Sequence, residues 1–345
     1  MSCTEERTRP RRSTEPTRGS NPWYSIRPVP SPRTDSPLSP CVLVVKTPVA
    51  SRKRVADRLV RTGRRLAGQV TDAAREQELT LATLLEALAR LGVTPVTFSV
   101  DALDARARKA IAGARLVITV GGDGTLLATS HWVTGAALLG VNSAPRSSVG
   151  YLSLARRVGL ARILARIAAG DLLPQRVIRL EVVLQEGLEE GLKEGTGGRL
   201  LPPALNDVLI AHEQPAATSR YQLRLGRKAE EHRSSGLWVA TAAGSTAGLR
   251  SAGGEAMPLA ARRLQFRARE LYRVRDHGTA LESGFVEPGQ ELVVESAMEA
   301  GWLFIDGARM ATRFPFGARA VFRVAREPLL LFADPARWAP VLPLE

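Results

Sequence analysis

The order of strand-like and helix-like segments constrains the fold of this chain more than any other feature of its sequence. Between residues 42 and 169, short apolar runs alternate with stretches whose apolar residues recur at helical spacing. The predicted strands are 42–46, 93–98, 116–120 and 136–141, and the predicted helices are 53–68, 76–91, 125–132 and 158–169. This alternation predicts an α/β domain with a Rossmann-like parallel sheet wrapped by helices.

After residue 171 the pattern changes, and most segments are typical of strands. Residues 178–184 largely alternate between apolar and polar side chains, and residues 186–198 are rich in Gly and Glu, as in a loop or insertion. Further predicted strands cover 205–211, 221–225, 236–241, 291–295, 302–306 and 320–325. We therefore expect a β-rich C-terminal domain of the β-sandwich type.

Four segments follow from these patterns. Residues 1–40 are rich in Arg, Ser, Thr and Pro, which predicts a disordered tail, or else a basic arm that touches nucleic acid or membrane. Residues 41–160 are expected to form the α/β nucleotide-binding domain and residues 161–325 the β-rich domain. Residues 326–345 form a C-terminal segment that we expect to pack back on the N-terminal domain.

Composition narrows the class of protein. Hydrophobic residues make up 44% of the 345 residues, enough for a sizeable core. No apolar run reaches the ~18 residues of a membrane helix, so we expect no membrane partner. The N-terminal residues lack the apolar stretch of a secretory signal, and two cysteines cannot build a disulfide framework. We expect a cytoplasmic protein.

The chain is strongly basic, with 48 lysine and arginine residues against 34 aspartate and glutamate residues, a formal net charge of +14. This surplus predicts affinity for anions, such as phosphorylated small molecules, nucleic acid or acidic surfaces. Aromatic residues are only 5% of the chain, and it carries no RRM, KH or zinc-finger pattern. These two observations argue against nucleic acid as the partner.

The sharpest local pattern is Gly-Gly-Asp-Gly-Thr at residues 121–125, between a predicted strand and a predicted helix. Gly121, Gly122 and Gly124 allow close approach of a phosphate, and N–H groups at the start of the helix form an anion site. Thr125 can cap the helix or donate to a phosphate oxygen. Asp123 would act as general base on an attacking hydroxyl, or accept N–H groups in a tight turn. Taken alone, the motif favours neither interpretation.

Two other patterns are candidates for binding. Asn206 and Asp207 interrupt an apolar strand, and their side chains suit the recognition of hydroxyls, although they also suit the start of a strand. Residues 241–254 are rich in Gly, Ala and hydroxyl side chains, which indicates backbone lying against a ligand or a flexible loop. Ser245 and Thr246 would donate hydrogen bonds there.

Together the three patterns resemble the NAD kinase family in order and spacing. The matching segments are GGDGTLL at 121–127, LNDVLIA at 205–211 and TAAGSTAGLRSAGG at 241–254, and the resemblance extends through GVNS at 140–143 and IDG at 305–307. The variant is similar to the plant NADH-kinase and mitochondrial-type branch, covering roughly residues 42–310.

This resemblance implies a kinase that transfers a phosphoryl group from ATP or polyphosphate to the 2′-hydroxyl of the adenosine ribose of NAD or NADH, making NADP(H). Asp123 would be the general base, and residues 121–125 would bind phosphate. The residues implied to bind NAD(H) are Asn206, Asp207, Ser245, Thr246, Ala247 and Ser251. Mg²⁺, or another divalent cation, would be held mainly by the donor's phosphates, without a dedicated metal site in the protein. The resemblance also implies a homo-oligomer.

Five further residues are weaker candidates. Arg233 and Arg250 would pair with phosphate oxygens, although surface arginines are usually solvated. His131 follows the phosphate motif on the same helix, where histidines more often pack or cap. Asp306 has a turn signal that by itself indicates a hairpin between residues 302–305 and 314–316. The fifth candidate is Asn142.

Two departures from the family pattern bear on the acceptor. Ser235 stands where the family commonly has a third acidic residue, and Gly248 where it has a tyrosine. A missing carboxylate favours NADH, because the oxidised nicotinamide ring is cationic and the reduced ring is neutral. Two other functions stay open: a lipid kinase of the diacylglycerol or sphingosine type, and a non-enzymatic basic binding module.

Overall fold

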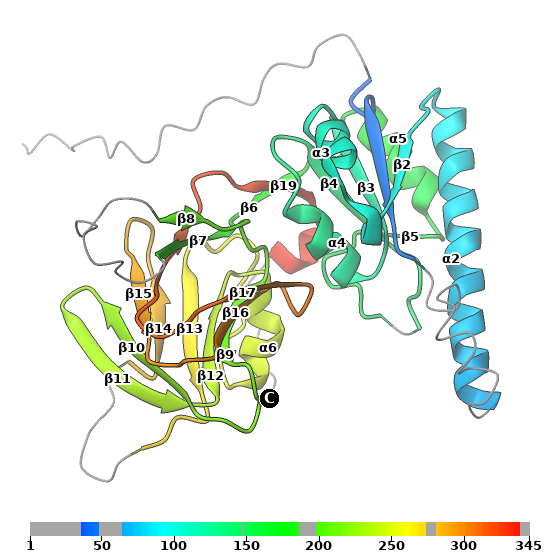
Figure 1. Ribbon diagram of the computed structural model, residues 1–345. Helices are drawn as coiled ribbons and strands as arrows, with labels where there is room; N and C mark the ends of the chain where they lie inside the picture. The colour runs from blue at the N-terminus through cyan, green and yellow to red at the C-terminus, as the bar shows by residue number, and fades with distance from the viewer. Residues whose placement is uncertain (1–35, 48–63, 147, 186–197, 274–280, 339–345) are drawn as a thin grey trace, which may run out of the picture. The chain divides into compact units, whose positions relative to one another are not determined.

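The computed structural model describes residues 36–47, 64–146, 148–185, 198–273 and 281–338. These residues form one mostly parallel sheet and two antiparallel sheets (Figure 1). Three predictions fall wholly or mostly outside the described residues: the tail, the helix at 53–68 and the loop at 186–198.

The first sheet has the strand order β2-β1-β3-β4-β19-β6, with β5 beside β4. Every pair in it is parallel except β19 with β6. All six residues of β3 are buried, as expected of a strand covered on both faces. The strands are β1 (Cys41–Val45), β2 (Val96–Ser99), β3 (Leu116–Gly121), β4 (Ala137–Asn142), β5 (Ala155–Arg156), β6 (Gln175–Val177) and β19 (Leu329–Phe332).

Helices cover both faces of this sheet. On one face Leu84 and Leu88 of α2 (Arg64–Arg90) share a core with α5 (Leu160–Ala168) and with Ile118 of β3. On the other face Leu126 of α4 (Asp123–Ser130) and Ile111 of α3 (Ala105–Ala112) form a second core with Val117 and Leu138. A short 3-10 helix, η3 (Val100–Ala102), follows β2 on that face.

The structure differs from the sequence-based predictions in the extent of this domain. Residues 161–177, expected in the β-rich half, form most of α5 and all of β6, because Leu164 packs into the core beneath α2 and β6 pairs with β19. Residues 64–75, most of which fall between the two helices predicted at 53–68 and 76–91, belong to the single helix α2, since no proline interrupts them. The C-terminal segment contributes β19 to the sheet, parallel to β4.

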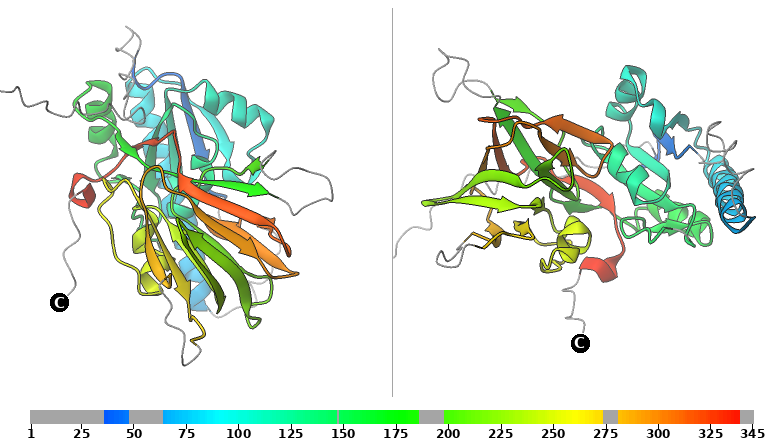
Figure 2. Two further views of the ribbon diagram at one scale, coloured as in Figure 1. Left: turned by 90° about the vertical axis from the view of Figure 1, so that its left-hand side faces the viewer. Right: turned by 60° about the horizontal axis from the view of Figure 1, so that its bottom comes forward.

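The remaining strands form two six-stranded antiparallel sheets, in the orders β11-β10-β15-β18-β7-β8 and β14-β13-β12-β9-β16-β17 (Figure 2). One apolar core contains residues of both sheets, such as Val182 and Leu223 from the first and Ile210 and Phe266 from the second. Two antiparallel sheets that share a core form a sandwich, and the predicted fold class is confirmed. The strands are β7 (Leu180–Gln185), β8 (Arg199–Leu200), β9 (Asp207–His212), β10 (Ser219–Leu225), β11 (Lys228–Ser234), β12 (Gly236–Ala240), β13 (Leu264–Arg269), β14 (Ser283–Val286), β15 (Leu292–Ser296), β16 (Gly301–Ile305), β17 (Met310–Arg313) and β18 (Arg319–Val324).

The connections beside these strands include short helices that matter for the site. These are η4 (Gly244–Thr246) and α6 (Gly248–Ser251), which follow β12, and η5 (Pro335–Trp338), which follows β19. The hairpin predicted around Asp306 has a different second strand: Ile305 pairs with Met310, so β17 and not residues 314–316 returns along β16. Within the described ranges no helix has the length and apolar character needed to cross a membrane.

Candidate active site

The phosphate motif lies where β3 ends and α4 begins, with Gly122 as the residue before the first turn of the helix. A Cβ at Gly121 would collide with the side chain of Thr125, and one at Gly122 would approach Ser148. Neither glycine has a positive φ. These two glycines are therefore required by close packing, while Gly124 is exposed with open space around it.

Asp123 occupies the first turn of α4, and its carboxylate is held by two backbone groups. The N–H of Tyr151 donates to Oδ2 at 2.7 Å, and the N–H of Leu152 donates to Oδ1 at 2.9 Å. These bonds fit the structural interpretation of Asp123, and they also fix the carboxylate beside the glycines. Each carboxylate oxygen can accept more than one hydrogen bond, so a substrate hydroxyl can still donate to it.

Asn142, the last residue of β4, has a structural role, whereas Ser143, the next residue, is a candidate for binding. The Asn142 amide donates to the carbonyl of Ser148 at 3.0 Å and accepts from the N–H of Ala144 at 3.1 Å, so it holds the following loop. The N–H of Ser143 donates to the carbonyl of Gly121 at 3.0 Å, which places Ser143 beside the phosphate motif. Its hydroxyl oxygen is buried and has no hydrogen-bond partner in the described part of the chain.

Asp306 organises the segment that contains Asn206 and Asp207. Its buried carboxylate accepts the N–H groups of Leu205 at 2.8 Å, Asn206 at 2.7 Å and Asp207 at 3.1 Å. Asp306 has a φ of +49°, a left-handed conformation that aspartate tolerates better than most residues. The sequence identified Asp306 through a turn signal and through the family resemblance at residues 305–307, but not in this role, which depends on residues about 100 positions away.

Burial changes the acid–base behaviour of these two carboxyl groups. Burial, and secondarily the charge of Asp306, raise the pKa of Asp207 to about 7. Burial also raises the pKa of Asp306, and this effect is opposed by His131 and by the three N–H groups that donate to it. Asn206 directly precedes Asp207 in the chain, and its side-chain oxygen is buried without a partner among the described residues.

Residues 241–254 lie directly against this segment. The Thr241 hydroxyl donates to the carbonyl of Leu205, and the N–H of Thr241 donates to the carbonyl of Asn206 at 2.8 Å. A Cβ at Gly244 would collide with the Asn206 backbone, so the two segments can pack only with glycine there. The chain thus brings the second and third sequence motifs together.

The other residues of the third motif differ in burial, and therefore in whether they can contact a ligand. Ser245 is fully buried, and its hydroxyl donates to the carbonyl of Ala242 at 2.7 Å and accepts from the N–H of Met257 at 2.8 Å. The Ser245 hydroxyl therefore uses both its donor and its acceptor to stabilise the fold. Thr246 and Ala247 are half-buried, whereas Ser251 and Arg250 are exposed.

Arg250, Arg233 and Gly248 are the remaining positions that the sequence singled out. The Arg250 guanidinium donates to the carbonyl of Gly254 at 3.1 Å, and Arg233 is exposed on β11, the outermost strand of its sheet. A Cβ at Gly248 would lie 2.7 Å from the Trp238 ring, so the indole takes up space beside the position of the family's tyrosine.

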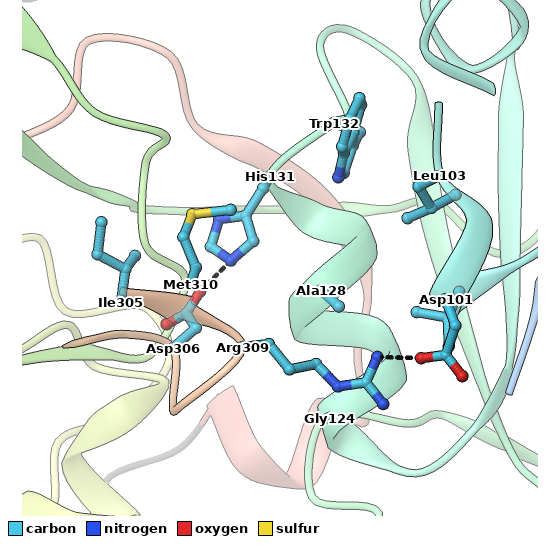
Figure 3. A pocket seen from close by; sticks show the side chains of 11 residues that line it. Asp101, Leu103, Gly124, Ala128, His131, Trp132, Ile305, Asp306, Arg309 and Met310 are labelled. Carbon is cyan, nitrogen blue, oxygen red and sulfur yellow. Dashed lines mark hydrogen bonds and ion pairs between the residues drawn. The ribbon is translucent and has the colours of Figure 1, made fainter. Parts of the chain in front are cut away.

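A cavity of about 330 Å³ lies along α4 (Figure 3). Gly124 from the phosphate motif, Ala128 and His131 form its helix wall, and η3 and the β16–β17 turn supply the rest. Arg309 and Asp101 form an ion pair of 2.8 Å across it. Sequence reasoning missed both of these residues, because neither lies in a motif.

His131 lies at the end of α4 and contacts the other half of the site. Its Nε2 is 3.5 Å from Oδ2 of Asp306, and the two side chains are only 4% and 1% exposed. Its Nδ1 is 3.1 Å from the carbonyl oxygen of Pro203. The helix that begins with the phosphate motif therefore ends against the segment that carries Asn206 and Asp207.

Comparison with known proteins agrees with this arrangement. Residues 42–172 match the family described as ATP-NAD kinase N-terminal domain. The chain is 37% identical over 217 residues to a probable NADH kinase of Oryza sativa, covering 56% of this chain and 63% of that protein. It is 36% identical over 212 residues to an NADH kinase of Arabidopsis thaliana, covering 56% and 65%. The matches thus span just under two thirds of these relatives.

Two solved structures share the fold. An NAD kinase from Archaeoglobus fulgidus in complex with ATP superposes with a TM-score of 0.59 at 18% identity, covering 86% of this chain and 95% of that one. Yeast NADH kinase complexed with NADH gives 0.58 at 14% identity, covering 71% and 68%. Residues 42–172 of this chain match the ATP-NAD kinase N-terminal domain, and the chain is similar to plant NADH kinases over 56% of its length.

Proposed function

We propose that the protein is an NAD(H) kinase that transfers a phosphoryl group from ATP or polyphosphate to the 2′-hydroxyl of the adenosine ribose. The observation that carries this proposal is a pair of buried oxygens with no hydrogen-bond partner among the described residues, Ser143 Oγ beside the phosphate motif and Asn206 Oδ1 in the segment that holds Asp207. A buried polar atom without a partner costs free energy, which a hydrogen bond to a ligand would offset. Both atoms belong to segments that resemble the family.

In the proposed reaction Asp123 takes the proton of the ribose hydroxyl as that oxygen attacks the terminal phosphorus. The bond between this phosphorus and the bridging oxygen of the donor breaks, and the shortened donor leaves with its electron pair. The two N–H groups that hold Asp123 keep the carboxylate in one orientation. Backbone N–H groups at the start of α4 would stabilise the charge on the transferred phosphoryl group.

We expect Mg²⁺ to accompany the donor. The described residues contain no group of three or more metal-ligating side chains, so the protein offers no complete cage there. Mg²⁺ is commonly held largely by substrate phosphates, so we expect the donor's phosphates to supply most of its ligands. When bound, the ion would neutralise charge on the donor phosphates.

Asp207 and Asn206 would form hydrogen bonds with the ribose hydroxyls or the nicotinamide amide of the acceptor. Thr246 and Ala247 would lie near its adenine. Ser251 is exposed and would contact the acceptor only at the edge of the site. Ser235 lies between β11 and β12, half-buried, with its N–H donating to the carbonyl of Arg269 at 2.9 Å. Because no carboxylate is present at 235, we propose NADH as the preferred acceptor.

We also make proposals about the location and the assembly of the protein. We propose a cytoplasmic enzyme, which the buried free thiol of Cys41 supports. We also propose a homo-oligomer, as in the family that the sequence resembles.

The test is an acceptor and donor panel with the purified chain. NADH, NAD⁺, diacylglycerol in vesicles and sphingosine in vesicles are each offered with Mg-ATP and with polyphosphate, and phosphorylated products are measured by mass spectrometry. We expect NADPH with at least one donor, at a higher kcat/KM than NADP⁺. Phosphorylated lipid without NADP(H) would replace this proposal with a lipid kinase. No product with any pair would favour a binding module.

A further inference from the structure

His131 joins two parts of the site that are distant in the sequence. It is the residue at the end of α4, whose first residue is Asp123. On its other side are Pro203 and Asp306, which flank and hold residues 205–207. Figure 3 shows the imidazole pointing from α4 toward the Asp306 carboxylate across the end of the cavity.

Both ring nitrogens of His131 face groups that only accept hydrogen bonds. Nδ1 is 3.1 Å from the Pro203 carbonyl oxygen, and Nε2 is 3.5 Å from the Asp306 carboxylate. A neutral imidazole carries one N–H and would turn a lone pair toward one of these acceptors. An N–H on Nε2 can donate to the Asp306 carboxylate, and one on Nδ1 can donate to the Pro203 carbonyl.

The Asp306 carboxylate transmits this contact to the backbone. The oxygen nearest His131, Oδ2, accepts the N–H of Leu205, and Oδ1 accepts the N–H groups of Asn206 and Asp207. These three bonds hold the residues that would bind the acceptor. If Asp306 shifts, the side chains of Asn206 and Asp207 shift with it.

We propose that His131 is a positioning residue, which acts through Asp306 to fix residues 205–207 in place relative to the phosphate motif at the start of α4. The role of residues 205–207 as acceptor segment rests on the proposed function, whereas the mechanical link does not. The loss of the contact between the ring and Asp306 would weaken the link and loosen the segment.

The charges around His131 come from each element packed against it. Asp306 at the end of β16 is the acidic group beside the ring. Arg179, in the segment before β7, is a nearby basic group, and its guanidinium donates to the carbonyls of Val133 at 3.1 Å and Ser130 at 3.5 Å. The Asp101–Arg309 pair across the cavity combines one charge of each sign.

Two variants separate the two contacts of the ring. His131→Asn places an amide donor near the Nδ1 position and removes the contact to Asp306, whereas His131→Gln can still donate to Asp306. We expect His131→Asn to raise the KM for NADH between about tenfold and a hundredfold, since small displacements of binding groups have effects of this size. His131→Gln should restore most of the affinity. The KM for the donor should stay unchanged in both variants.

His232→Asn is the matched control. His232 is also a buried histidine beside a carboxylate, with Nε2 3.3 Å from Oε2 of Glu230, but it lies on β11. We expect it to lower the Tm without changing the KM for NADH. Equal increases in KM for His131→Asn and His232→Asn would indicate general loosening and overturn the proposal.

Hydrogen–deuterium exchange gives a readout that does not require activity. The amides of residues 205–207 should exchange faster in His131→Asn than in wild type, while His131→Gln and His232→Asn leave them protected. Unchanged exchange at these amides in His131→Asn would overturn the positioning role. If the wild type phosphorylates neither NADH nor NAD⁺, the proposed function fails, and the exchange result still decides the link.

Discussion

Replacement of Asp207 by asparagine should change how the stability of this protein depends on pH. Asp207 is 6% exposed and lies next to Asp306. Burial raises its pKa from 3.8 to about 7 in the folded chain. At 1.36 kcal/mol for each pKa unit, this shift corresponds to about 4 kcal/mol between the two protonation states.

The direction follows from proton binding. Between pH 4 and 7 the folded chain holds the Asp207 proton and the unfolded chain releases it, so this group favours the folded state less as the pH rises. The stabilisation that Asp207 gives the folded chain is fully present below the pKa of Asp207 in the unfolded chain. It is lost as the pH rises through the pKa of Asp207 in the folded chain. Asparagine does not titrate. The free energy of unfolding of Asp207→Asn, minus that of the wild type, should therefore rise by up to about 4 kcal/mol from pH 4 to pH 8.

Urea denaturation followed by tryptophan fluorescence at pH 4, 5, 6, 7 and 8 measures this difference, because the chain has 5 tryptophans. Asp72→Asn is the control, since Asp72 is exposed on α2 and its replacement removes a carboxylate that is not buried. A flat difference for Asp207→Asn, or one that falls as the pH rises, would refute the argument that burial keeps this carboxyl group protonated.

Three further predictions concern the proposed reaction. Ser143→Ala should leave the Tm nearly unchanged, because the Ser143 hydroxyl has no partner in the described structure. It should lower kcat/KM by about two- to tenfold, which corresponds to the loss of one hydrogen bond to the substrate. A loss of stability without a kinetic effect would contradict this. Ser235→Asp should raise the ratio of NAD⁺ to NADH in kcat/KM, and an unchanged ratio would remove the reason for an NADH preference. EDTA in excess over Mg²⁺ should abolish turnover with ATP, added Mg²⁺ should restore it, and turnover that persists in EDTA would contradict a role for the ion.

Local sequence patterns predicted the elements that carry the motifs. The apolar run at 116–120 followed by three glycines and a helical pattern placed the phosphate motif at the β3–α4 junction, where the structure has it. In contrast, β11 was missed because its sequence, KAEEHRS, lacks apolar alternation. An outermost strand with most of its residues exposed has little need of it.

Long-range contacts were beyond the reach of these patterns. Residues 326–345 were expected to pack back on the N-terminal domain, but no local signal indicates that β19 pairs with β4, since the whole β-rich half separates the two strands. Likewise, the turn signal at Asp306 did not reveal that its carboxylate holds residues 205–207. The pattern also could not distinguish Asn142, which serves the loop, from Ser143, whose hydroxyl is unpartnered among the described residues.

The same limit applies to Ser245 and Asp123. A hydroxyl in a Gly/Ala-rich segment suggests binding, but packing decided that the Ser245 hydroxyl bonds Ala242 and Met257. For Asp123, sequence reasoning left a structural and a catalytic interpretation open. The bonds from Tyr151 and Leu152 satisfy the first without excluding the second. Chemistry at Asp123 therefore has to be measured.

The most direct measurement is the single-turnover rate of NADPH formation from NADH and Mg-ATP, in wild type and in Asp123→Asn. NADH binding is followed by NADH fluorescence in both proteins. Asp104→Asn is the matched control, because the Asp104 carboxylate at the start of α3 also accepts a backbone N–H, that of Ala107 at 2.9 Å. We predict rapid NADPH formation by wild type and Asp104→Asn, and a loss of at least about a hundredfold in Asp123→Asn with NADH still bound. NADPH formation at the wild-type rate by Asp123→Asn would contradict its role as the base, and no NADPH from folded wild type that binds both substrates would contradict the kinase itself.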